Sequence, residues 1–414
     1  MLRTIAFSTA ALLAALPAAA QEAAPETTPT EFHMMQLQDG QLSGPGADVI
    51  LAHLPDAQFV LIGEDHGFAD PPRIAAAIAA AAAPYGMNHH VIEVGGISAD
   101  WARDILAAGG TDAFADALEG RPLAIPFINF QEDAELALPF LAPHDDGRVR
   151  LWGVDQEFIG SPLIHFEALA DLAPTAAARA HVETLLAAET TAFDTGQQQA
   201  VFMASADQDS LAVLREHFAG SERALTIIGE LQESMAIYQA IFSGDIYGSN
   251  QARISYMRDR FLSEYRRAAE IEDAPRALFK FGAIHLGLGT TFLHTFDLGS
   301  LTEGIAAANG LDTLRILISP LAGEKTNTRP SPDGVFKTGP FTSADTEKML
   351  GTLGIAASAV PDEGYLVVPL APARAQLGQK GLADLDPIPR SFMIGYDYLI
   401  TTAGADAATP LAVK

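Results

Sequence analysis

Four stretches of the chain end in side chains that can move protons or hold a metal ion. The first, VLIGEDHG at residues 60–67, runs three large apolar residues into a glycine, two carboxylates and a histidine. A neutral histidine takes a proton from water near pH 7 when a carboxylate fixes its tautomer, so general base catalysis is one chemistry to expect. The ionisable residues at the four ends are Glu64 and His66, then Glu93, Asp155 and His285.

The same residues suit a metal ion. His66, Glu93 and His285 would make a set of two histidines and one carboxylate, with an open position for water, which suits hydrolysis at Zn²⁺ or Mn²⁺. The spacing of these residues along the chain neither supports nor excludes this set, because ligands from different strands have no fixed spacing. Both chemistries remain open from the residues alone.

Each residue also has a purely structural explanation. A single histidine at a strand end is more often hydrogen-bonded structure than a catalyst, and Asp65 is suited to a turn. Glu93 could pair with an arginine, Asp155 could cap a helix, and Arg73 could be a solvated residue in a first helical turn. The case for a site depends on position, because ligands bind outside the carboxyl ends of parallel strands, and four strands deliver ionisable groups there.

The order of apolar and helical segments predicts the sheet that positions these residues. Strands are expected at residues 57–62, 89–94, 148–155, 276–285, 313–319, 363–370 and 396–402. Helices are expected between them, one opened by Asp70 with Pro71 in its first turn and one opened by Ser98. Strands separated by helices indicate right-handed βαβ units, so we predict an α/β fold with a mainly parallel central sheet flanked by helices.

A long helical stretch interrupts this alternation at about residues 162–275. Residues 225–242 and 250–270 within it are clearly amphipathic helices. We therefore predict one α/β domain over residues 46–414, with a large helical insertion over the carboxyl edge of the strands. Residues 21–45 are expected to be a leader or linker.

The composition bounds the class of protein. The chain has 414 residues, 49% hydrophobic and 19% charged, with no cysteine and a net charge of −27. Residues 1–20 have a positive start, an apolar middle and a small-residue end, which predicts a cleaved signal peptide and a periplasmic or secreted protein. No other segment approaches the ~20 apolar residues of a membrane span. The acidic balance disfavours nucleic acid, whose phosphates need clustered Lys and Arg.

Other common motifs are missing from the chain. The glycine-containing loops 244–250 and 287–292 match neither the dinucleotide-binding nor the P-loop pattern, and neither HExxH nor GxSxG occurs. His89 and His90 precede the apolar core of an expected strand and could line the opposite edge of the sheet.

Five blocks together resemble the erythromycin esterase family, whose superfamily includes the ChaN-like haem-binding proteins and the TraB/Tiki proteases. The blocks lie in chain order at residues 58–78, 89–96, 149–157, 250–261 and 395–410. The resemblance implies that His66 is the base for water attack on an ester or lactone. It also implies family positions for Gly63 with Glu64, for Arg73, Glu93 and Asp155, and for Arg253 with Met257 and Asp259.

The resemblance also has departures. The spacing from Gly63 to His66 is one residue shorter than in the esterases, and Gly282 stands where a second histidine would precede His285. Both Gly-x-x-His segments are closer to the ChaN and Tiki branches, which weakens an expectation of macrolide specificity. We expect Glu64 or Glu93 to orient His66, His285 or Arg73 to stabilise the oxyanion, and Asp155 and Arg253 to contact the substrate, with no cofactor.

A ChaN-like haem carrier is the alternative from another class. Haem needs an axial ligand and a broad apolar face, and the chain offers Tyr85, Tyr238, Tyr247 and Tyr256. A Tiki-like metal-dependent hydrolase is the other alternative. The substrate's identity and the oligomeric state do not follow from the sequence.

Overall fold

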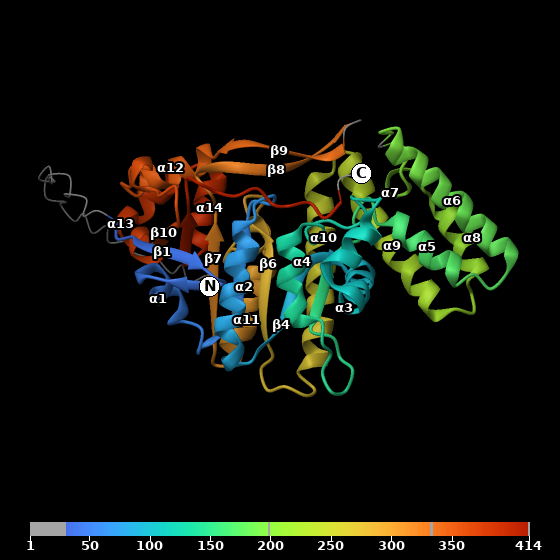
Figure 1. Cartoon of the computed structure of the whole chain (residues 1–414), viewed down its shortest axis with the longest axis horizontal. Helices are drawn as coiled ribbons and strands as arrows, with labels where there is room; N and C mark the ends of the chain where they lie inside the picture. Colours follow the sequence, from blue (N-terminus) through green and yellow to red (C-terminus); the bar gives the residue numbers. More distant parts are fainter. Residues whose placement is uncertain (1–29, 198, 332–333, 413–414) are drawn as a thin grey trace, which may run out of the picture.

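The computed structural model describes residues 30–197, 199–331 and 334–412, and the expected signal peptide of residues 1–20 lies outside these ranges. A nine-stranded sheet runs through the molecule in the order β2-β1-β10-β11-β7-β3-β6-β4-β5, and β8 and β9 form a separate hairpin (Figure 1). The strands are β1 (His33–Gln38), β2 (Gln41–Ser43), β3 (Ala57–Glu64), β4 (Met87–Gly95), β5 (Leu151–Asp155), β6 (Arg276–Gly282), β7 (Asp312–Ile318), β8 (Ala322–Ser331), β9 (Gly334–Thr342), β10 (Tyr365–Pro369) and β11 (Tyr398–Thr401).

Six adjacent strands of the sheet, from β11 to β5, pair in parallel, and β10, β1 and β2 continue it antiparallel. The mixed but mainly parallel α/β sheet of the sequence analysis is therefore confirmed. The four strands that carry the candidate residues are neighbours in the order β3-β6-β4-β5. Their carboxyl ends consequently meet at one place.

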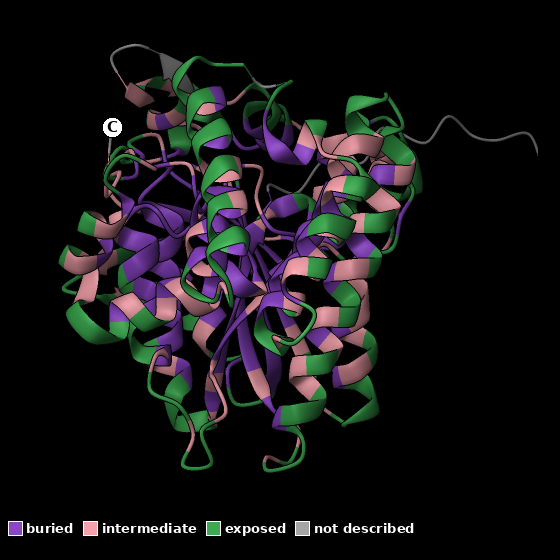
Figure 2. Ribbon diagram, turned by 90° about the vertical axis from the view of Figure 1, so that its right-hand side faces the viewer, coloured by how far each residue is buried: buried purple, intermediate pink, exposed green. Residues whose placement is uncertain are grey.

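Helices cover both faces of the sheet. They are α1 (Pro45–Leu51), α2 (Asp70–Ala82), α3 (Gly96–Leu118), α4 (Gln131–Ala137), α5 (Pro162–Asp171), α6 (Ala176–Asp194), α7 (Phe202–Ser205), α8 (Gln208–His217), α9 (Glu222–Phe242), α10 (Ile246–Ala268), α11 (Leu298–Ala308), α12 (Ala344–Thr352), α13 (Leu370–Ala383) and α14 (Pro387–Gly395). β3 is buried over its whole length and alternates between the two cores. Val60 and Ile62 pack with α2, α3 and α4, whereas Phe59 and Leu61 pack with α10 and α11. Figure 2 shows this buried centre between exposed outer helix faces.

The helical stretch between β5 and β6 has a core of its own. Phe166, Val182, Leu214 and Ile228 are among its buried residues, and α5 to α9 stand beside the β5 edge of the sheet (Figure 1). α10 returns along the sheet and packs on β5. Through the end of α9 and the start of α10, this segment reaches the carboxyl edge of the strands.

Two expectations about individual segments need correction, and one hairpin was not foreseen. Residues 33–43, assigned to a leader, form β1 and β2, and His33 to Met35 pair with β10. β6 ends at Gly282, so His285 lies in a following 3-10 turn, Ala283–His285, rather than in the strand. The β8–β9 hairpin was not expected, because its polar, half-exposed strands lack the apolar runs used to find the others. Among the described residues, no helix is long and apolar enough to cross a membrane.

Candidate active site

His66 lies two residues after the end of β3 and is held between two carboxylates. Its Nδ1 lies 2.7 Å from Glu64 Oε1, and its Nε2 lies 3.4 Å from Glu93 Oε2. The imidazole stacks on Phe127 with 3.9 Å between ring centroids. The His66 side chain remains 30% exposed, whereas both carboxylates are nearly inaccessible. The ring is thus fixed in orientation while one edge stays open to solvent.

Glu93, at the end of β4, is the centre of the cluster. Its Oε2 accepts a hydrogen bond of 2.6 Å from the backbone N–H of Gly282, and its Oε1 accepts one of 2.9 Å from Arg253 Nη2. His285 Nε2 lies 3.6 Å from the same Oε1. Burial alone would raise the pKa of Glu93, but His66, His285 and Arg253 together lower it well below its usual range. Glu93 is therefore an anion contacted by a guanidinium and two imidazoles from three other elements.

Arg253 joins α10 to the sheet. Its Nε donates to Asp155 Oδ1 at 2.9 Å, and its Nη2 contacts both Asp155 and Glu93. Burial would lower the pKa of Arg253, but the charges of Asp155 and Glu93 outweigh burial and raise this pKa above its ordinary value. A permanent cation consequently lies at the end of β5, beside the carboxylate that faces His66.

His285 is held in the same way as His66. Its Nδ1 lies 2.7 Å from Asp297 Oδ2, and the Asp297 Oδ1 accepts the Leu298 N–H at the start of α11. Each histidine therefore has a carboxylate on Nδ1 and directs Nε2 towards Glu93. This arrangement sets the tautomer of both rings, because a carboxylate at Nδ1 favours a proton there.

A buried lysine forms an ion pair with Glu64 on the side away from the cavity. Lys280, in the middle of β6, contacts Glu64 Oε1 and lies 2.7 Å from Asp133 Oδ1 on α4. Burial would raise the pKa of Glu64, but Lys280 and His66 hold it below its usual range. Burial, with the charge of Glu64, raises the pKa of Asp133 to about 7 despite Lys280. Glu64 is thereby kept ionised beside His66.

The two carboxylates change the protonation of His66. Burial would lower the pKa of His66, but its hydrogen bonds to Glu64 and Glu93 and their charges raise it to about 9. At pH 7 the resting ring is mostly an imidazolium, with on the order of 1% neutral. The sequence analysis started from the ordinary value near 6.5, and the difference arises because both carboxylates lie within ion-pair distance.

The cluster forms the floor of a cavity of about 730 Å³. This volume lies within the roughly 300–1,000 Å³ typical of small-molecule sites. Apolar side chains contribute much of the wall, notably Ile237 and Ile241 of α9, Ile246 of α10, Leu293 and Phe392. The helical segment between β5 and β6 thus provides one side of the cavity.

Six of the seven residues expected at the site lie together on this floor. Glu64, His66, Glu93, Asp155, Arg253 and His285 all line the cavity. Arg73 does not. Its guanidinium turns towards the C-terminal segment, where it donates to Asp406 at 2.7 Å and to Glu132 at 3.3 Å. Arg253 supplies the cation that we expected from Arg73.

In the expected metal set, His66 and His285 each direct Nε2 at a different oxygen of Glu93, but the three donor atoms do not all lie within 4.8 Å of one another. Among the described residues, the group whose histidine and carboxylate donors all lie within 4.8 Å of one another is His89, His144 and Glu272, at the other edge of the sheet. Glu93 is moreover engaged by Arg253 and by the Gly282 N–H. These contacts favour an acid–base site on the floor of the cavity.

Residues that the sequence analysis missed complete the site. Lys280 has a sequence signal, since it interrupts the otherwise apolar run of residues 277–281. Asp133 and Asp297 lie at helix starts, where an acidic residue is expected for capping alone. Phe127 lies in an irregular loop and carries no signal. Gly63 leaves room for Tyr396, whose hydroxyl would lie 2.1 Å from a Cβ at that position.

A substitution at Gly282 tests whether turnover depends on the close approach of His66 to Glu93. A Cβ at this position would lie 3.1 Å from His66 Nε2 and 3.5 Å from Glu93 Oε2. We expect Gly282→Ala to lower kcat/KM about 10- to 100-fold by displacing His66, with little loss of stability. Gly339→Ala is the matched control, since a Cβ there meets nothing within 4 Å. Equal activity of the two variants would mean that this gap plays no part in turnover.

Comparison with known proteins identifies the fold. No protein-family model and no curated protein sequence matches the chain. Among solved structures, a histidine-to-asparagine mutant of erythromycin esterase EreC in its open conformation is 14% identical, with a TM-score of 0.58 over 91% of this chain and 98% of that one. A succinoglycan biosynthesis protein is 12% identical, with a TM-score of 0.55 over 90% and 95%. A Bacillus cereus protein is 14% identical, with a TM-score of 0.50 over 91% and 96%. The chain has an erythromycin esterase-like fold.

Proposed function

We propose that this protein is an exported hydrolase that uses water to open an ester or lactone, with His66 as the general base. One observation carries the proposal most directly. His66 lies at the open floor of a substrate-sized cavity, with Glu64 on its Nδ1 and its Nε2 directed into the cluster of Glu93, Arg253 and His285. The likeness of fold to an erythromycin esterase supports the same class of reaction.

In the proposed reaction, neutral His66 takes a proton from water at Nε2. Glu64 accepts the Nδ1–H bond, and it stabilises the imidazolium as that forms. The resulting hydroxide adds to the carbonyl carbon, and the guanidinium of Arg253 stabilises the negative oxygen of the tetrahedral intermediate. The C–O bond then breaks, and the leaving alkoxide takes a proton from an imidazolium, which gives an acid and an alcohol.

The cavity favours a substrate with an apolar body. Its walls are largely apolar, and its floor carries Glu64, Glu93 and Asp155 alongside Arg253. The protein as a whole is strongly acidic, with a net charge of −27. We therefore propose a neutral or cationic small molecule as the substrate, whose ester carbonyl faces the polar floor.

The pH dependence distinguishes the roles of the two histidines. The pKa of His66 is raised to about 9, so its neutral fraction grows as the pH rises towards that value. If His66 is the base, kcat/KM rises roughly tenfold per pH unit between pH 7 and 8.5 and levels off above about 9. If His66 must instead be protonated, with His285 as the base, kcat/KM falls above pH 9. Rates of enzyme-catalysed hydrolysis, corrected for the uncatalysed reaction, decide between them.

Export is proposed from the first 20 residues. Mass spectrometry of the protein recovered outside the cytoplasm should find the chain beginning at Gln21. A chain that keeps Met1 and stays in the cytoplasm would overturn this part of the proposal.

A further inference from the structure

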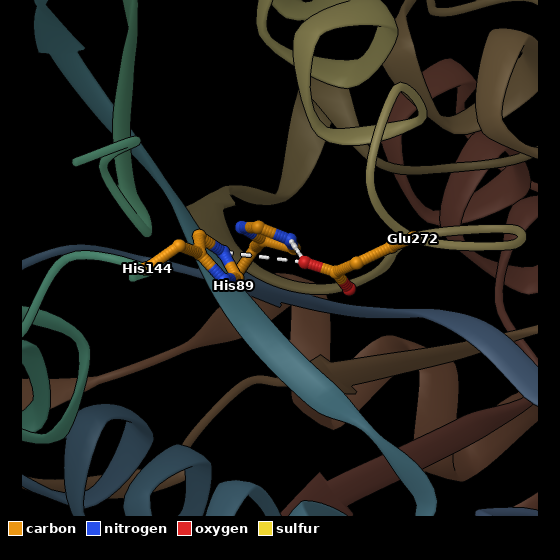
Figure 3. A group of neighbouring side chains, drawn as sticks. All are labelled: His89, His144 and Glu272. Carbon is orange, nitrogen blue, oxygen red and sulfur yellow. Dashed lines mark hydrogen bonds and ion pairs between the residues drawn. The ribbon is translucent and has the colours of Figure 1, made fainter. Parts of the chain in front are cut away.

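A second cluster of metal-type ligands lies at the amino edge of the sheet, opposite the candidate active site. His89 lies near the start of strand β4, His144 is in the loop before β5, and Glu272 is in the loop between α10 and β6. β6, β4 and β5 are neighbours, so the segments that enter these strands meet. Figure 3 shows the three side chains converging from these separate segments.

We propose that His89, His144 and Glu272 bind one divalent cation of the Zn²⁺ class. The three residues offer donor atoms that all lie within 4.8 Å of one another. His89 Nε2 lies 2.8 Å from Glu272 Oε1, and His144 Nε2 lies 3.2 Å from the same oxygen. A zinc ion with ligands at about 2.0–2.2 Å needs donors roughly 3.3–3.5 Å apart, so small side-chain adjustments would admit it.

The donor types select the class of cation. Two imidazoles and one carboxylate suit Zn²⁺ and its neighbours in the first transition row, whereas Mg²⁺ and Ca²⁺ prefer all-oxygen sites. Asn88 Nδ2 contacts the other Glu272 oxygen at 3.3 Å, so it would orient the carboxylate from the outer shell. A cavity of about 240 Å³, lined in part by His89 and His144, adjoins the cluster and leaves space for a water ligand.

The hydrogen bonds within this cluster do not satisfy all of its buried polar atoms. His144 Nε2 is buried and makes no hydrogen bond to any residue that the structure describes, although it lies near Glu272. His89 is fully buried, and its ring is held in place by stacking on Trp152 at 4.2 Å between ring centroids. His89 Nε2 already shares a hydrogen bond with Glu272, so His144 Nε2 is the nitrogen facing this carboxylate without a hydrogen-bond partner among the described residues, and a cation held by all three side chains would satisfy it.

Binding can be measured by a signal from the site itself. Trp152 stacks on His89, and the chain has two tryptophans in all. Titration with Co²⁺ should quench Trp152 fluorescence and produce the visible absorption of a tetrahedral cobalt site. Calorimetry with Zn²⁺ should find one equivalent bound, and Zn²⁺ should raise the Tm.

Three variants locate the site. His144→Ala should weaken Zn²⁺ binding by more than the roughly 10–100-fold that loss of an outer-shell partner costs, and it should abolish cobalt quenching of Trp152. Glu272→Gln keeps the size of the side chain and should weaken Zn²⁺ binding in the same way. It replaces His144→Ala as the test if that variant does not fold. His181→Ala is the control, since His181 and His217 have the same 5.2 Å centroid separation as His89 and His144 but no assigned carboxylate ligand.

Three results would overturn the proposal. The first is the absence of Zn²⁺ binding at millimolar concentration. The second is binding that survives both His144→Ala and Glu272→Gln. The third is binding that is lost in His66→Ala instead, which would assign the cation to the carboxyl edge of the sheet.

Discussion

Replacing His66 by alanine should lower kcat by roughly 10²–10⁴-fold, the usual contribution of a general base. The effect is expected to fall on kcat more than on KM, because His66 lies on the floor of the cavity and the walls are formed by other residues. The imidazolium of His66 also lies between Glu64 and Glu93 and offsets their negative charges. Its removal therefore increases the repulsion between these two carboxylates. Steady-state kinetics on any substrate of the wild type measures this loss.

The fold of the His66→Ala variant needs a control. The His66 side chain is 30% exposed, but its imidazolium offsets the charges of Glu64 and Glu93, so a lower unfolding midpoint is expected and the kinetics must be measured well below it. His181→Ala, in α6 of the separate helical core, should keep full activity. A His66→Ala variant that is folded and retains more than about a third of the wild-type kcat would remove His66 from the mechanism.

Replacing Lys280 by methionine should produce the largest loss of stability, about 3–5 kcal/mol in the free energy of unfolding. Lys280 is 5% exposed and lies between Glu64 and Asp133, which are 3% and 7% exposed. Removing the cation takes the paired charge from Asp133 and leaves Glu64 with His66 alone. Urea unfolding at pH 7 measures the difference directly.

Two further variants test the cause of that loss. Lys280→Met with Asp133→Asn should recover part of the stability, because one of the two carboxylates is then neutral. Lys348→Met removes the exposed pair with Asp386 and should cost no more than about 1 kcal/mol. If Lys280→Met costs no more than Lys348→Met, the buried ion pairs do not support the site.

The sequence predicted the site better than it predicted the contacts within it. Glu64, Glu93, Asp155 and His285 follow strands that are easily recognised, and parallel strands bring their carboxyl ends together. Arg253 was found by resemblance, because a helix position alone says nothing of which strand it reaches. Arg73 was placed wrongly at the site, since the C-terminal segment that binds it is distant in the chain.

What escaped prediction depends on contacts between distant segments. The raised pKa of His66 requires Glu93 from another strand, and Lys280 acts through Glu64 and Asp133 from two other elements. The β8–β9 hairpin packs on the loop of His66, where Lys325 lies 2.6 Å from Asp65. Such contacts depend on how distant segments are arranged in the fold. The pattern of apolar and polar residues along one sequence does not determine that arrangement.

The most direct test is hydrolysis itself. The purified protein should be incubated with a panel of neutral and cationic esters and lactones, with and without a chelator, and the products followed by mass spectrometry. We predict that at least one compound gains a water molecule, that the chelator leaves the rate unchanged, and that His66→Ala abolishes turnover. An inert protein, or equal turnover by the variant, would contradict the hydrolase assignment, and a Soret band on adding haemin would then favour a haem carrier.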